Sequence, residues 1–107
     1  MTILVVSTWV VKPEKQEEFM QLWQRHLKYR KENPEMFKEL KSFKLFTQTF
    51  GGISGAYVEL VEYNSLADYE KLIAKISKDK GFMKMLQEFI LLIDPDTLSE
   101  NVWNAIT

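Results

Sequence analysis

Apolar and β-branched residues are concentrated in segments that predict β-strands. Residues 3–11 (ILVVSTWVV) are largely apolar at both alternating sets of positions and end at Lys12-Pro13, which predicts a strand buried on both faces. Residues 42–50 and 56–63 flank the segment GGISG and predict a β-hairpin. A short edge strand is expected within residues 99–106, near the carboxyl end.

Helical periodicity fills the intervals between these strands. The first helix is predicted to begin at Pro13 and to end before Pro34, because proline favours the first helical turn and restricts the residue before it. The second is predicted to follow Asn64 or Ser65 as N-cap, and residues 82–93 form a further helical stretch that ends before Pro95. The predicted inward face of the first helix comprises Phe19, Leu22, Trp23, His26 and Arg30.

The order β-α-β-β-α-β predicts a single ferredoxin-like α+β domain over residues 1–107. Four antiparallel strands would carry the helices on one face. The other face of the sheet would then be apolar and uncovered, which small monomers rarely tolerate. We therefore expect a homodimer in which two sheets pack face to face as a dimeric α+β barrel.

A five-residue turn at residues 51–55 predicts a hairpin register in which paired residue numbers sum to 106. This register places Glu59 opposite Thr47. A phosphate-binding loop is the alternative interpretation of the three glycines, but the segment is followed by a strand and has no Gly-Lys-Ser/Thr motif. The glycines therefore predict a turn with positive φ angles.

Composition narrows the function classes. The chain has no cysteine, which excludes disulfides and thiolate metal sites, and its formal charge of −1 offers no general attraction for nucleic acid or anionic membranes. No apolar run reaches the ~18 residues of a membrane helix. The amino terminus lacks the basic start of a signal peptide, so a cytoplasmic location is expected.

The chain resembles the dimeric α+β barrel superfamily, which includes antibiotic-biosynthesis monooxygenase-like, NIPSNAP-like and stress-responsive barrel proteins. The resemblance rests on VVSTWVVKPEKQEEFMQLW and on SFKLFTQTFGGISGAYVELVEYNSLADYEKL, and it extends over nearly the whole chain. It implies the barrel fold and the dimer. The chemistry of such proteins ranges from cofactor-independent oxygenation and isomerisation to haem breakdown.

His26 and Glu59 are the candidate catalytic residues. His26, the only histidine, is either a general base at a pocket between sheet and helices or a structural histidine at the margin of the core. If the sheet face that carries Glu59 is buried at the dimer interface, the pKa of Glu59 rises and it can act as a base near neutrality. Alternatively, Glu59 pairs across that interface with a lysine or arginine, or is exposed near the barrel mouth.

Aromatic and hydroxyl side chains are candidate ligand-binding groups. Trp9, Trp23 and Tyr57 would hold an aromatic ring, and Ser7 or Thr47 would orient it. The alternative is that the aromatic side chains belong to the core. Trp103 is predicted to be an interface anchor.

No cofactor and no metal are expected. One histidine without cysteines makes a dedicated transition-metal site unfavourable. In the haem-degrading relatives the resemblance implies a histidine on the second helix and an asparagine on the first strand. This chain has no histidine on its second helix, and its first strand has Ser7 and Thr8, so haem binding is not expected.

Three functions remain open from the sequence. The first is a dimer that binds a small apolar or aromatic molecule. The second is a cofactor-independent monooxygenase or isomerase with Glu59 or His26 as base. The third is a structural or interaction dimer without ligand.

Overall fold

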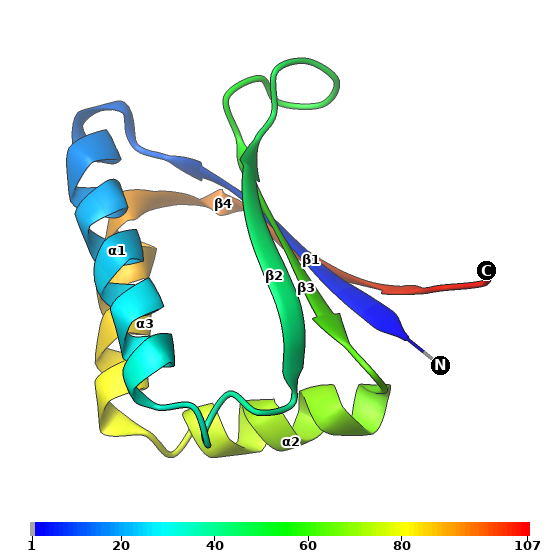
Figure 1. Ribbon diagram of the computed structural model, residues 1–107. Coiled ribbons are helices and arrows are strands. Elements are labelled where there is room, and N and C mark those ends of the chain that lie inside the picture. Colours follow the sequence, from blue (N-terminus) through cyan, green and yellow to red (C-terminus); the bar gives the residue numbers. More distant parts are fainter. Residues whose placement is uncertain (1) are drawn as a thin grey trace.

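The computed structural model describes residues 2–107 and has the expected ferredoxin-like α+β architecture. A four-stranded antiparallel sheet in the order β2-β3-β1-β4 carries the helices on one face (Figure 1). The elements are β1 (Ile3–Val11), a 3₁₀ turn η1 (Pro13–Lys15), α1 (Gln16–Glu32), β2 (Leu40–Thr47), β3 (Tyr57–Tyr63), α2 (Leu66–Ile76), α3 (Lys80–Leu92) and β4 (Ile93–Asn104).

The helices form two groups. α1 and α3 run side by side along the sheet, and α2 crosses one end of it (Figure 1). α1 has acidic side chains in its first turn and basic ones in its last turn, which complements the helix dipole. Its end at Glu32, two residues before Pro34, agrees with the sequence-based expectation.

Capping side chains define α2 and α3. Ser65 Oγ accepts a hydrogen bond of 3.1 Å from the Asp68 backbone N–H, so Ser65 is the N-cap and Asn64 is not. Asp79 caps α3 in the same way through the Phe82 N–H, at 2.9 Å. Tyr29 of α1 donates a hydrogen bond to Asp79, so the junction between α2 and α3 is attached to α1.

The helix-facing side of the sheet is divided between two core clusters. One lies beneath α2 and the connection from α1 to β2, and the other lies beneath α1 and α3. The first contains Ile3, Val5, Phe37, Val61, Tyr63 and Leu72, and the second contains Trp9, Val11, Phe19, Leu22, Leu92 and Ile93.

The hairpin register predicted from the sequence is wrong by two residues. Phe46 pairs with Val58 and Thr47 with Tyr57, so paired numbers sum to 104. The strands end earlier because Gln48 and Ala56 close a longer loop, in which Gly51, Gly52 and Gly55 adopt positive φ. The shift is even, so every side chain keeps its predicted face. Glu59 therefore lies opposite Leu45, and Thr47 is not its partner.

β4 is longer than the predicted strand within residues 99–106. It begins at Ile93 and pairs with β1 in two stretches, residues 93–94 and 99–104, which are separated by a register shift between Thr8 and Val10. The Thr97 hydroxyl accepts a hydrogen bond from the Val10 N–H at this irregularity. Because β4 is an edge strand, Pro95 is tolerated within it.

The second face of the sheet has no helix against it among residues 2–107 (Figure 1). Alternation along the strands assigns to this face Leu4, Val6, Val10, Phe46, Val58, Leu60 and Trp103. Phe46 and Trp103 are among the exposed large apolar side chains.

Among residues 2–107, no helix has the length and apolar character needed to cross a membrane.

Candidate functional site

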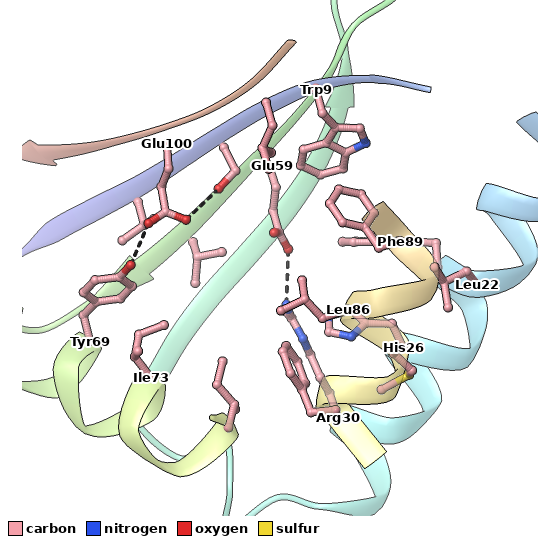
Figure 2. Close-up of a pocket in the computed structure, with 18 of the residues that line it drawn as sticks. Trp9, Leu22, His26, Arg30, Glu59, Tyr69, Ile73, Leu86, Phe89 and Glu100 are labelled. Carbon is pink, nitrogen blue, oxygen red and sulfur yellow. Dashed lines mark hydrogen bonds and ion pairs between the residues drawn. The ribbon is translucent and has the colours of Figure 1, made fainter. Parts of the chain in front are cut away.

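A cavity of about 320 Å³ lies between the helix-facing side of the sheet and the three helices (Figure 2). Its size is at the lower end of the range for small-molecule sites. The lining side chains are Val5, Ser7, Trp9, Phe19, Leu22, Trp23, His26, Arg30, Glu59, Val61, Tyr63, Tyr69, Ile73, Ile76, Phe82, Met85, Leu86, Phe89, Leu98 and Glu100.

Most of the cavity wall is apolar, with aromatic rings concentrated near β1 and the facing helices. The centroid of the Trp9 ring lies 5.1 Å from that of Phe89 and 6.0 Å from that of Phe19, and both pairs are edge-to-face. Trp9 and Phe19 are buried, whereas Ile73, Leu86 and Leu98 are exposed and mark the open side of the cavity. An apolar ligand can therefore enter from the side of α2, α3 and β4 and contact aromatic rings inside.

An ion pair joins α1 to the sheet inside this wall. Arg30 Nη2 lies 3.2 Å from Glu59 Oε2, and the two side chains are 12% and 14% exposed. Figure 2 shows Glu59 extending from β3 toward Arg30. The remaining Arg30 nitrogens, Nε and Nη1, are buried without a hydrogen-bond partner among residues 2–107. The guanidinium carbon lies 4.2 Å from the centroid of the Phe43 ring, so cation–π attraction stabilises this group.

Burial dominates the protonation of Glu59. It raises the pKa of the Glu59 carboxyl, and the nearby Arg30 guanidinium opposes that rise. Glu100 adds a smaller repulsion that also raises the pKa. The pKa of Glu59 is therefore shifted upward, the direction that favours a general base, although its Oε2 is already bonded to Arg30 of the same chain and not to a residue across a dimer interface.

His26 lies between two aromatic rings on the same wall. Its ring centroid is 5.3 Å from Trp23 and 5.6 Å from Phe82. Burial, and secondarily the positive charge of Arg30, lower the pKa of His26 to about 3. The imidazole is therefore neutral near neutral pH, with one nitrogen that donates and one that accepts a hydrogen bond. As a base it is weaker than the sequence-based hypothesis assumed.

A polar row crosses the sheet at Ser7. On β1, Ser7 pairs with Glu59 of β3 on one side and with Glu100 of β4 on the other. Glu100 Oε1 accepts a hydrogen bond of 2.7 Å from Tyr69 of α2, and its Oε2 accepts one of 3.4 Å from Ser7. Burial and the Glu100 carboxylate raise the pKa of Tyr69 to about 12, so its hydroxyl remains protonated.

The structure brings five of the seven predicted site residues to the cavity: Ser7, Trp9, Trp23, His26 and Glu59. Thr47 and Tyr57 do not line it. The centroid of the Tyr57 ring lies 4.5 Å from that of Phe19, and the Tyr57 hydroxyl donates a hydrogen bond to Gln16 Oε1. Thr47 is exposed at the end of β2, beside the glycine loop.

Sequence reasoning assigned no role to Arg30, Tyr69 or Glu100. Arg30 was visible as the last member of the apolar stripe of the first helix, where a charged residue requires a buried partner. Tyr69 of α2 and Glu100 of β4 meet only through the placement of α2 across the sheet, which no local pattern predicts. Among residues 2–107, no group of three or more histidine, aspartate or glutamate side chains is placed to hold a metal ion.

Taken together, the sheet order, the helices on one face and the cavity between them define a ferredoxin-like α+β protein with an internal pocket. The family model described as NIPSNAP matches residues 5–95, so the chain belongs to the NIPSNAP family. A search of curated proteins found no match.

Solved structures share the fold at low sequence identity. A NIPSNAP family protein from Agrobacterium tumefaciens is 16% identical, with a TM-score of 0.73 over 97% of this chain and 92% of that one. An uncharacterised NIPSNAP domain protein from Burkholderia xenovorans is 10% identical, with a TM-score of 0.74 over 98% and 95%. SnoaB, a cofactor-independent oxygenase from Streptomyces nogalater whose structure is that of a mutant, is 14% identical, with a TM-score of 0.68 over 99% and 94%.

Proposed function

We propose that this protein binds a small apolar or aromatic molecule in the cavity between the sheet and the helices. The observation that carries the proposal is the combination of aromatic walls with a few convergent polar groups in a cavity of about 320 Å³. Trp9 and Phe89 supply contact area for a ring, and Glu59 and His26 supply acceptors for its polar substituents.

Ligand binding is testable through the tryptophans of the cavity wall, Trp9 and Trp23. Titration with a panel of small aromatic compounds should quench or shift their fluorescence. Ile73→Trp narrows the open side of the cavity, whereas Ile90→Trp adds the same bulk on α3 outside the lining. The two isoleucines are 41% and 40% exposed, which makes them a matched pair.

We expect Ile73→Trp to weaken binding at least about tenfold and Ile90→Trp to leave it unchanged, because only the first competes with the ligand for space. Equal affinities in the two variants would contradict the proposed location. If no compound of the panel binds at millimolar concentration, the alternative of a structural or interaction dimer without ligand is favoured.

Cofactor-independent oxygenation is a second candidate function, favoured by the raised pKa of Glu59 at the cavity wall and by the structural likeness to SnoaB. Glu59 would remove a proton from an electron-rich aromatic substrate. The resulting carbanion would reduce O₂, so that a CH₂ group becomes C=O, with one oxygen atom in the product and the other in water. All electrons and hydrogens then come from the substrate.

Oxygen uptake with a panel of dihydroxy-aromatic compounds tests this candidate. Glu59→Gln is expected to lower turnover at least about a hundredfold, which is the usual contribution of a general base. Its control is Glu70→Gln, the same change at an exposed glutamate of α2 outside the cavity lining. Absence of turnover in the wild type, or unchanged turnover in Glu59→Gln, would rule out the candidate.

We further propose that two copies associate through the uncovered faces of their sheets. Support comes from the apolar side chains gathered on that face, including Val58, Leu60, Phe46 and Trp103. Large contiguous apolar patches are rare on the surfaces of monomers. The resulting interface would be isologous, so each copy would contribute the same side chains.

A further inference from the structure

The cavity lining has more negatively charged side chains than positively charged ones. Its lining carries two carboxylates, Glu59 and Glu100, and one guanidinium, Arg30. His26 adds no charge near neutrality because its pKa is lowered to about 3. The side chains of the cavity wall therefore carry one net negative charge.

Arg30 is not available to an anionic ligand. Its Nη2 is bonded to Glu59, and its Nε and Nη1 are buried and have no contact with solvent. The guanidinium also lies against the Phe43 ring, with 4.2 Å between its carbon and the ring centroid. A carboxylate ligand would have to separate Arg30 from Glu59 and leave Glu59 without a partner, which is unfavourable for a buried acid.

Glu100 differs from Glu59 because no cation among residues 2–107 is paired with it. Its two oxygens accept hydrogen bonds from neutral hydroxyl groups, those of Tyr69 and Ser7. It is exposed and lies beside Leu98 and Ile73 at the open side of the cavity. Figure 2 shows its carboxylate directed to Tyr69, on the opposite side of the cavity wall from Trp9 and Phe89.

We propose that the cavity selects an apolar amine, with its hydrocarbon or aromatic body against Trp9 and Phe89 and its protonated amino group at Glu100. This inference rests on the proposed function and names the ligand class of that same cavity. The ammonium group would donate to the Glu100 carboxylate in a charge-assisted hydrogen bond. The Tyr69 ring, 5.2 Å from that of Tyr63, offers an additional aromatic surface to the cation.

Three probes of one shape and different charge test this inference: phenethylamine, phenethyl alcohol and phenylacetate. Their affinities can be measured by isothermal titration calorimetry at neutral pH. The amine is expected to bind about tenfold more tightly than the alcohol, in line with a hydrogen bond to a charged group. Phenylacetate is expected to bind more weakly than the alcohol.

Substitutions of acidic residues test whether Glu100 causes the preference for the amine. Glu100→Gln should reduce the preference for the amine over the alcohol to about twofold or less, within ordinary hydrogen-bond differences. Glu70→Gln, an exposed glutamate that follows Tyr69 on α2 outside the lining, should leave the preference unchanged. Tyr69→Phe removes a competing donor from Glu100 and should preserve or increase the preference.

The neutral alcohol separates the two proposals. If the alcohol binds without any preference for the amine, or if phenylacetate binds most tightly, the inference of an amine site is overturned and the proposed cavity function stands. An amine preference that persists in Glu100→Gln also overturns it. If none of the three probes binds, both proposals fail for ligands of this size.

Discussion

Two largely buried ionisable side chains, His26 and Glu59, have pKa values shifted in the direction of their neutral forms. Burial is the main cause for both, because the charged form of each group loses hydration. Arg30 contributes in opposite directions, because its positive charge disfavours the protonated imidazole and favours the ionised carboxylate. Each shift makes the stability of the fold depend on pH.

For His26 the folded pKa of about 3 lies below the unfolded value of 6.5. Between these values the unfolded chain binds a proton that the folded protein does not, so stability is lost as the pH falls below 6.5. The upper limit is about 1.4 kcal/mol per pH unit. We expect urea unfolding of the wild type to show this loss and that of His26→Phe to lack it. Parallel pH profiles for the two proteins would contradict a buried neutral imidazole.

For Glu59 the shift has the opposite sign. Its folded pKa is raised, so its contribution to stability is present at low pH and is lost as the pH rises through the folded value. Arg30→Met removes the group that opposes this rise. We expect the variant to lose about 3 kcal/mol near neutral pH, because an acid is left buried without a partner.

Urea unfolding at mildly acidic and mildly alkaline pH measures this loss. The deficit of Arg30→Met should shrink toward acidic pH, and adding Glu59→Gln should restore much of the stability. A deficit that is independent of pH would show that Arg30 acts through packing against Phe43 and not through its charge.

At the level of elements, the hairpin loop is where the local sequence rules for turns and strand register predicted the structure least well. Its glycines were correctly predicted to have positive φ, but the loop is longer than five residues, because Gln48 bonds to the Ile53 carbonyl and pairs with Ala56. The helices α1 and α2 follow their sequence signals closely, since proline, cap residues and apolar stripes act within a few residues. The start of β4 depended on a partner strand far along the chain.

Gly55→Ala tests the backbone of this loop. Gly55 has a φ of +85°, and a Cβ placed there meets no atom within 4 Å, so only backbone strain is introduced. We expect a loss of about 1–2 kcal/mol in the free energy of unfolding. Thr49→Ala, at an exposed position of the same loop whose side chain makes no hydrogen bond among residues 2–107, should change it by less than about 0.5 kcal/mol. Equal effects in the two variants would argue against the positive φ.

At the level of the whole molecule, the proposed dimer is tested by the mass of the particle. Sedimentation at micromolar concentration should give twice the 12.7 kDa of one chain. Phe46→Glu places a charge on the uncovered sheet face and should dissociate the dimer, because a charge buried without a partner is costly. Ile90→Glu, on α3, is the control, since Phe46 and Ile90 are 45% and 40% exposed. A monomeric wild type would contradict the proposal.

The sequence by itself determined the number and order of the elements, the faces of the strands, the inward stripe of α1 and five of the residues around the cavity. These features follow from periodicity and capping, which act within one turn or one strand. Only the tertiary structure decided that Glu59 pairs with Arg30 and that Glu100 meets Tyr69. Such contacts depend on strand register and on helix docking, where a shift of a few residues costs little in local propensity but changes every partner.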